Sequence, residues 1–281
     1  MVTPVNTHNL PIGVFDSGVG GLTVLRELRK LLPRESFIYF GDTARVPYGS
    51  KSQDIVRTFS MQIGAWLAQR PAKAVVVACN TASALALPAL HERLSVPVFG
   101  VIQPGASAAV SASNGTIGVL ATRATIASDA YQKAIHRIDT SRKVISVAAP
   151  LLVPLIEEGE ISGEIAKAVL EKYLSPLRSE KCDTILLGCT HYPLLKPLLS
   201  ELWNEAIAID SAQATAQIVS HELTHRKLNR TESSESKTQL FLTDSGGNFL
   251  SVAELFLGEK PVLSGTVRID ELETSLALLA S

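Results

Sequence analysis

The segments IGVFDS at residues 12–17 and AVVVACNT at residues 74–81 each place a short apolar run directly before polar side chains. Two later segments are similar to them in the same order, IGVLAT at residues 117–122 and TILLGCTH at residues 184–191. The first pair is offset by 105 positions, from 12 to 117, and the second by 110, from 79 to 189. Two matches in one order at nearly one offset predict an internal repeat, in which each half carries a cysteine at the end of a strand.

Short apolar runs of this kind recur along the chain and alternate with segments of helical period. They are rich in β-branched residues and mostly apolar on both faces, as strands of a covered parallel sheet are. Between them, residues 51–69 form a predicted helix with Ile55, Phe59, Ile63, Trp66 and Leu67 on one apolar stripe. This alternation predicts an α/β fold. The predicted strands are residues 12–15, 37–40, 74–78, 98–101, 117–120, 144–147, 185–187 and 207–209, with strand-like segments at 239–243 and 262–269.

The repeat and the alternation together predict two similar α/β domains with mainly parallel sheets, which face each other across a cleft. The first domain comprises residues 1–102 plus 210–281 and contains Cys79, and the second comprises residues 103–209 and contains Cys189. Ligands of open parallel sheets bind beyond the carboxyl ends of the strands. We therefore expect the active site in the cleft between the two domains.

Composition narrows the classes of function. Of the 281 residues, 46% are hydrophobic and 19% charged, and the net charge is −1, so the basic excess of a nucleic-acid-binding protein is missing. No run of about twenty apolar residues could span a membrane, and residues 1–10 do not have the pattern of a secretion signal. Three cysteines are too few, and odd in number, for a disulfide framework. We expect a cytoplasmic protein with reduced thiols.

Small polar side chains follow the predicted strands. This pattern favours a site for a small, polar, charged ligand. A dinucleotide fingerprint that includes Gly18 and Gly20 would need a third glycine at position 23, where the chain has Thr23, so a phosphate-binding loop is not predicted. The strand-end side chains are Asp16, Ser17, Cys79, Asn80, Thr81, Thr122, Cys189, Thr190 and His191.

The three cysteines have different sequence surroundings. A buried cysteine is more often a small hydrophobic residue than a catalyst, and Cys182 is interpreted in this way. Cys79 and Cys189 each precede a predicted helix N-terminus, where the helix dipole favours a thiolate. With one neighbouring histidine and no Cys-x-x-Cys spacing they would make a poor zinc site, so no metal ion is expected.

Two thiols in one cleft suit the racemisation of an α-carbon. That reaction removes a proton from one face of the carbon and returns a proton to the opposite face. Two acid–base groups on opposite walls, one a thiolate and the other a thiol, can do this without turning the substrate over.

Four motifs resemble those of the glutamate racemases: FDSGVGG at residues 15–21, DTARVPYG at 42–49, ACNTAS at 78–83 and GCTHYP at 188–193. The resemblance extends from about residue 10 to about residue 258. It implies an enzyme that interconverts L- and D-glutamate without pyridoxal phosphate or another cofactor and supplies D-glutamate for peptidoglycan. It also implies a homodimer.

The resemblance assigns roles to individual residues. Cys79 is expected to act on D-glutamate with Asp16 as its partner, and Cys189 on L-glutamate with Glu157 and His191 as helpers. Gln103 and Ala149 depart from the family pattern. The core is also expected to begin near residue 11, which leaves no room for the long N-terminal extension that some family members have. The residues expected to bind substrate are Asp16, Ser17, Tyr48, Gly49, Asn80, Thr81, Thr190 and His191, with Thr122 and Thr125 as weaker matches.

Other interpretations stay open at the level of the sequence. The chain could be an aspartate racemase, or another isomerase or decarboxylase of the same superfamily, although the intact cysteine pair favours racemisation. It could also be a two-domain protein that binds a small molecule without catalysis. Glu157 could be a surface charge on a helix, and His191 could have only an orienting role.

Overall fold

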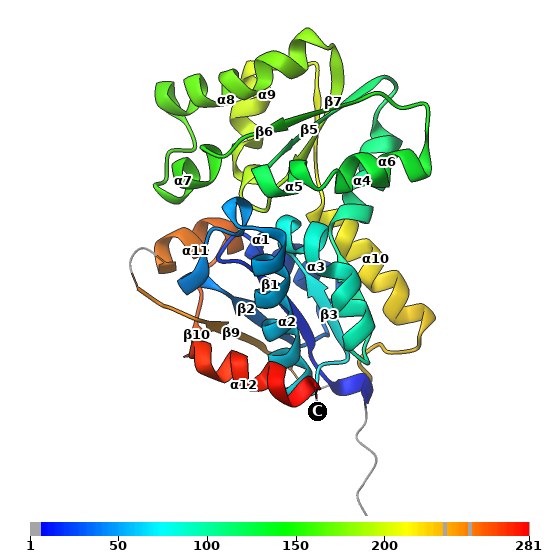
Figure 1. Ribbon diagram of the computed structural model, residues 1–281, viewed down its shortest axis with the longest axis vertical. Helices are drawn as coiled ribbons and strands as arrows, with labels where there is room; N and C mark the ends of the chain where they lie inside the picture. Colours follow the sequence, from blue (N-terminus) through cyan, green and yellow to red (C-terminus); the bar gives the residue numbers. More distant parts are fainter. Residues whose placement is uncertain (1–6, 233–234, 247–248, 281) are drawn as a thin grey trace, which may run out of the picture.

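A computed structural model describes residues 7–232, 235–246 and 249–280. It contains two β-sheets, stacked along the long axis of the molecule with helices on both faces of each sheet (Figure 1). Every strand pair among the described residues is parallel. The predicted fold class, two similar α/β units with mainly parallel sheets, is confirmed.

The two sheets repeat one strand order. The first sheet has the order β10-β9-β2-β1-β3-β4 and the second has the order β6-β5-β7-β8. The run β2-β1-β3-β4 therefore corresponds strand by strand to β6-β5-β7-β8, with β1 matching β5 and β3 matching β7. These are the two pairs of similar segments in the sequence. The first-sheet strands are β1 Ile12–Asp16, β2 Phe37–Gly41, β3 Ala74–Val77, β4 Val98–Gly100, β9 Thr238–Leu242 and β10 Leu263–Thr266, and the second-sheet strands are β5 Thr116–Ala121, β6 Val144–Ala148, β7 Cys182–Gly188 and β8 Ile207–Asp210.

Helices cover both faces of each sheet because alternate strand residues point to opposite faces. Ile12 and Val14 pack against α1, α10 and α11, whereas Phe15 packs on the opposite face against α2, α3 and α12. In the second sheet, Leu186 packs against α4 and α6, and Ile185 packs against α8 and α9. The helices are α1 Leu22–Leu31, α2 Gln53–Gln69, α3 Asn80–Arg93, α4 Ile102–Ala112, α5 Arg123–Ala127, α6 Ala130–Ile138, α7 Leu152–Glu157, α8 Gly163–Ser179, α9 Lys196–Leu202, α10 Ala212–His225, α11 Phe249–Leu257 and α12 Ile269–Ala280.

Two sequence-based expectations about burial were wrong in detail. Ile55 was expected on the apolar stripe of α2, but it is 45% exposed, and the neighbouring Val56 is buried instead. The strands were also expected to be apolar and buried throughout. The second sheet has only four strands, and its edge strands β6 and β8 are half-buried, so that Ile207 is 49% exposed.

The chain passes between the two sheets twice. The first sheet takes its strands from residues 12–100 and 238–266, and the second from residues 116–210. The proposed domain boundaries, 1–102 plus 210–281 and 103–209, agree with this division of strands and stay a proposal. No helix of the described residues is both long enough and apolar enough to cross a membrane.

Candidate active site

A cleft of about 320 Å³ lies where the strand ends of the two sheets meet. Both Cys79 and Cys189 line it. Asp16 does not line the cleft, because it is fully buried behind Ser17, and Thr125 also lies behind the wall. The other sequence-predicted residues that line the cleft are Ser17, Tyr48, Gly49, Asn80, Thr81, Thr122, Glu157, Thr190 and His191.

Cys79 lies at the end of β3 and forms the N-cap of α3. Its sulfur accepts a hydrogen bond from the backbone N–H of Ala82 at 3.4 Å and lies 3.6 Å from the hydroxyl oxygen of Ser17. The backbone N–H at the helix N-terminus acts to lower the pKa of this thiol, in the expected direction, but other interactions outweigh it. Burial and then the nearby Asp16 carboxylate raise the pKa of the Cys79 thiol to about 12, and the bonds from Ala82 and Ser17 only partly offset this.

Asp16 ends β1 and is fully buried. One carboxylate oxygen accepts the backbone N–H of Gly18 at 2.9 Å, and the other has no hydrogen-bond partner among the described residues. Burial raises the pKa of this carboxyl, against the lowering effect of the charge on His191 and of the backbone N–H groups around it. Asp16 is therefore a buried group with one free oxygen, within electrostatic reach of Cys79.

Cys189 directly follows β7 and lies in different surroundings. Its sulfur lies 3.9 Å from Nδ1 of His191, and Nε2 of His191 lies 3.0 Å from a carboxylate oxygen of Glu157. Burial acts to lower the pKa of His191, but hydrogen bonds and charge interactions with Cys189 and Glu157 outweigh it and raise the pKa to about 10. His191 is thus an imidazolium at neutral pH, held between a thiol group and a carboxylate.

The helix expected directly after Cys189 begins later. Residues Tyr192–Leu195 form a 3₁₀ helix, and the α-helix α9 begins only at Lys196. Pro193 lies in the first turn of the 3₁₀ segment. The cation beside Cys189 is therefore the side chain of His191, not a helix terminus.

Comparison with known proteins places the cleft in a family. A family model described as Asp/Glu/Hydantoin racemase matches residues 12–219. The glutamate racemase of Geobacter metallireducens is 50% identical over 251 residues, which are 89% of this chain and 93% of that protein. The chain belongs to the glutamate racemase family. It is therefore an isomerase of the amino-acid racemase class.

Solved structures of the family have the same architecture. The crystal structure of Francisella tularensis glutamate racemase in complex with D-glutamate matches with a TM-score of 0.88 and 37% identity, over 94% of this chain and 98% of that chain. An aspartate racemase homologue from Pyrococcus horikoshii matches with a TM-score of 0.55 and 15% identity, over 76% of this chain and 99% of that chain. The second likeness shows a shared fold alone.

The glycine loop after β1 lets the two halves of this racemase approach each other. A Cβ atom on Gly20 would lie 2.2 Å from Oγ1 of Thr190 and 2.5 Å from Nδ1 of His191. Thr23, in the first turn of α1, contacts the same segment with its hydroxyl, 3.4 Å from the carbonyl oxygen of Thr190. The loop following Asp16 therefore packs directly against the segment that carries the second half of the site.

The side-chain hydroxyls of Tyr48 and Thr81, two of the predicted substrate-binding residues, have protein partners. The hydroxyl of Tyr48 donates to the buried carboxylate of Asp42, so only the ring and backbone of Tyr48 face the cleft. Thr81 forms a ring of hydroxyl contacts with Thr122 at 2.9 Å and Thr125 at 3.1 Å. These contacts join the first turn of α3 to α5 and hold the two walls of the cleft together at that end.

Sequence reasoning missed several residues of the site, among them Arg123 and Phe256. Arg123 lines the rim of the cleft directly after Thr122, and the strand-end pattern could have identified it. Phe256 of α11 packs edge-on against the ring of His191, with centroids 4.9 Å apart. No local signal marks Phe256, because it is 65 positions from His191 and comes from the other sheet's helices.

The segment HELTH at residues 221–225 has the His-Glu-x-x-His spacing of zinc peptidases. It lies on α10, where the two histidine rings stack with centroids 6.4 Å apart and His221 is largely exposed. Among the residues that the structure describes, no third His, Cys, Asp or Glu completes a metal-binding group. The motif therefore lies outside the cleft and does not form a peptidase centre.

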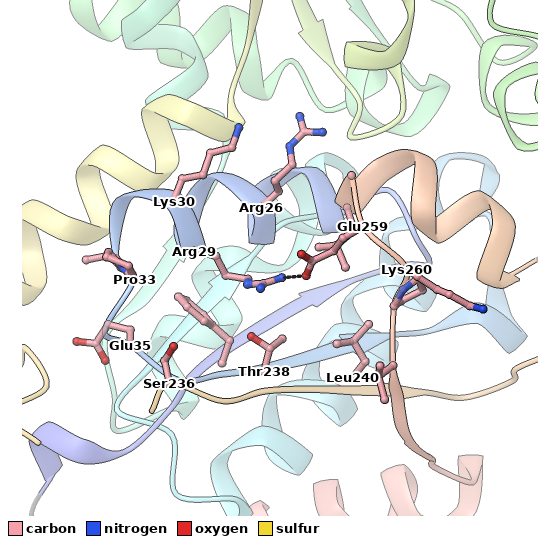
Figure 2. A pocket seen from close by; sticks show the side chains of 16 residues that line it. Arg26, Arg29, Lys30, Pro33, Glu35, Ser236, Thr238, Leu240, Glu259 and Lys260 are labelled. Carbon is pink, nitrogen blue, oxygen red and sulfur yellow. Dashed lines mark hydrogen bonds and ion pairs between the residues drawn. The ribbon is translucent and has the colours of Figure 1, made fainter. Parts of the chain in front are cut away.

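A larger cavity of about 670 Å³ lies between α1, the segment that leads from the end of α11 to β10, and strands β2 and β9 (Figure 2). None of the sequence-predicted site residues lines it. Much of its charge is paired, since Arg29 contacts Glu259 at 2.5 Å and Glu35 contacts Lys73 at 2.5 Å. We assign the chemistry to the smaller cleft, which holds the thiols, the imidazolium and the strand-end hydroxyls.

Proposed function

We propose that this racemase interconverts L-glutamate and D-glutamate by moving the Cα proton between Cys189 and Cys79, without a cofactor. The observation that carries the proposal is the placement of two thiols at matching strand ends, β3 and β7, of two similar sheets, on the walls of one cleft. A proton can then leave one face of the substrate and return to the other.

The electrostatic surroundings of the two thiols differ. Cys79, with a pKa raised to about 12, is a thiol at neutral pH. Beside Cys189, the imidazolium of His191 can pair with the thiolate that the reaction of L-glutamate requires. The cleft therefore offers a proton donor on the Cys79 wall and a cation that supports a base on the Cys189 wall.

The proton balance for L-glutamate follows from this arrangement. The Cys189 thiolate takes the Cα proton, and the electron pair of the broken C–H bond stays on the substrate as a carbanion conjugated with its carboxylate. Cys79 gives its proton to the opposite face of Cα, which yields D-glutamate, a Cys79 thiolate and a Cys189 thiol. The reverse reaction begins from that second state: the Cys79 thiolate takes the Cα proton of D-glutamate, and Cys189 gives its proton to the opposite face.

The lining of the cleft supports chemistry without pyridoxal. Pyridoxal enzymes hold the cofactor as a Schiff base on a lysine, and none of the described residues that line this cleft is a lysine. Neutral hydroxyl and amide groups are suited to the two carboxylates of glutamate, and Arg123 adds a positive charge at the rim. Because polar groups left unpaired by a wrong substrate carry a free-energy cost, we expect aspartate and glutamine to be much poorer substrates.

Turnover in D₂O tests the proposal. L-Glutamate incubated with the purified protein, without pyridoxal phosphate, should yield D-glutamate with deuterium at Cα, and prior treatment with hydroxylamine should not change the rate. A Cys182→Ser variant, which changes a thiol outside the cleft, should behave like the wild type. Product that keeps its original hydrogen would exclude the two-thiol route, and a comparable kcat/KM for aspartate would favour an aspartate racemase.

The cellular setting belongs to the same proposal. D-Glutamate made by this reaction would serve peptidoglycan synthesis, as the family resemblance implies. A cytoplasmic location is supported by three cysteines that are all free thiols. A homodimer stays a prediction, which the mass of the purified protein in solution, against 30.1 kDa for one chain, would test.

A further inference from the structure

Asn80 lines the cleft next to Cys79, and its side-chain amide has one satisfied end and one free end. The carbonyl oxygen accepts a hydrogen bond from the hydroxyl of Tyr131 at 2.5 Å. The amide nitrogen is buried and has no hydrogen-bond partner among the described residues. A buried donor without a partner is rare and carries a free-energy cost, so this N–H₂ group is available for a ligand in the cleft.

Tyr131 comes from the other half of the molecule, on α6, and is 2% exposed. Its hydroxyl donates to the carbonyl oxygen of the Asn80 amide. This contact favours the amide orientation with oxygen toward the tyrosine, which leaves the amide nitrogen without a protein partner among the described residues.

The backbone makes room for Tyr131 directly beside the second thiol. A Cβ atom on Gly188, the residue before Cys189, would lie 2.8 Å from the ring of Tyr131. Ser211 follows β8 at the place where the chain returns from the second sheet to the first. Tyr131 thus contacts the strand end that carries Cys189 and the connection between the sheets, and it reaches across to the residue beside Cys79.

We propose that Tyr131 is a positioning residue, which fixes the side-chain amide of Asn80 so that its N–H groups donate to a carboxylate of the substrate. This inference rests on the proposed function, because it takes glutamate as the ligand of the cleft. Tyr131 itself does not line the cleft, so it acts through Asn80. The hydroxyl of Tyr131 sets the orientation of the Asn80 amide, and the packing of the Tyr131 ring against the end of β7 sets the position of that hydroxyl.

A double-mutant cycle tests the inference. Tyr131→Phe removes only the hydroxyl and should lower kcat/KM for glutamate by about tenfold, mainly through a higher KM, because the amide can then turn. In an Asn80→Ala background, where no amide is left to position, the same change should have an effect below about twofold. The matched control is Tyr173→Phe, which removes a buried hydroxyl that accepts the backbone N–H of Leu151, and should have the same effect on kcat/KM in both backgrounds.

The outcomes separate this inference from the proposed function. If the wild type racemises glutamate, but Tyr131→Phe lowers kcat/KM equally with and without the Asn80 side chain, the positioning role is wrong and the proposed function is unaffected. A wild type that does not racemise glutamate would remove both. If Tyr131→Phe does not fold, Asn80→Asp gives a second route: it keeps an acceptor for the Tyr131 hydroxyl and replaces the free donor end of the amide by an oxygen, so it should raise KM for glutamate by at least about tenfold. An unchanged KM in Asn80→Asp would contradict donation from this amide to the substrate.

Discussion

The thiol of Cys79 lies among a serine hydroxyl, a helix N-terminus and the buried carboxylate of Asp16, whereas the thiol of Cys189 lies beside an imidazolium. The strands that carry them, β3 and β7, hold the same place in the repeated strand order. Backbone symmetry is therefore accompanied by electrostatic asymmetry. A carboxylate next to a thiol raises its pKa, and an imidazolium next to a thiol favours the thiolate.

The difference shows how one repeated scaffold can serve two opposite roles. A proton transfer between two faces needs one acid and one base at any moment, and two identical surroundings would favour neither distribution. Here burial and the Asp16 carboxylate favour a proton on Cys79, and the imidazolium of His191 can pair with a thiolate at Cys189. The repeated strands place the two thiols on opposite walls of the cleft. The electrostatic difference between the thiols comes from residues that differ between the halves: Asp16 near Cys79, and His191 with Glu157 near Cys189.

The largest effect is expected from replacing either catalytic thiol. Cys79→Ser and Cys189→Ser should each lower racemisation by at least about 1,000-fold, because a hydroxyl is too weak an acid to form the base at neutral pH. Elimination from an analogue with a leaving group on Cβ needs only one proton abstraction. Cys79→Ser should therefore retain elimination from the L form, and Cys189→Ser from the D form. Near-wild-type racemisation in either variant would return that cysteine to a structural role.

The contact between the halves should be sensitive to one methyl group. Gly20→Ala would place a Cβ atom 2.2 Å from Thr190 and 2.5 Å from His191, so it should displace the imidazolium and lower kcat/KM by about 100-fold. The matched control is Gly18→Ala, where the added atom would lie 3.0 Å from a methyl group of the half-exposed Val46. Steady-state rates of both variants, with circular dichroism to check folding, make the comparison. Equal activities would show that the packing of the loop against His191 does not matter.

Replacing the carboxylates of Asp16 and Glu157 should have a smaller effect, and each replacement should affect the two enantiomers of a substrate analogue differently. The two enantiomers of glutamate have equal free energies in water, so kcat/KM for racemisation must be the same in both directions for any variant. Racemisation rates therefore cannot show that a substitution affects one enantiomer more than the other. Elimination from each enantiomer of the analogue can. We expect Asp16→Asn to slow elimination from the D form, and Glu157→Gln from the L form, each by about tenfold more than from the other form. Equal slowing of both forms by either variant would contradict the assignment of partners.

Thiol reactivity should show the asymmetry without any substrate. At pH 7.5 we expect iodoacetamide to alkylate Cys189 about fivefold faster than Cys79, measured by peptide mass spectrometry. The thiolate form of Cys79 increases as the pH rises toward its pKa of about 12, and His191 loses its proton as the pH rises through about 10. The preference should therefore decrease above pH 9. A preference for Cys79 at neutral pH would contradict the proposed difference between the two thiols.

Local sequence patterns were sufficient for much of the fold. The eight strands that were predicted outright all occur, with ends shifted by up to three residues, and the two cysteines end the strands expected. Sequence patterns did not predict the burial of every side chain. They placed Ile55 on the buried face of α2, although it is exposed, and they could not show that Ile207 would lie on an edge strand of a four-stranded sheet. They also could not show that the helix after Cys189 would begin as a 3₁₀ turn.

What the sequence by itself determined is the chemistry that follows each strand, because apolar runs and the residues directly after them are neighbours along the chain. What only the tertiary structure decided is which distant groups share a charge or a hydrogen bond. Glu157 meets His191 across 34 positions and Tyr131 meets Asn80 across 51. The pKa of Cys79 likewise depends on burial, which no strand has until the sheets and helices pack. Burial and long-range contact are properties of the folded chain, and they give the two thiols different electrostatic surroundings.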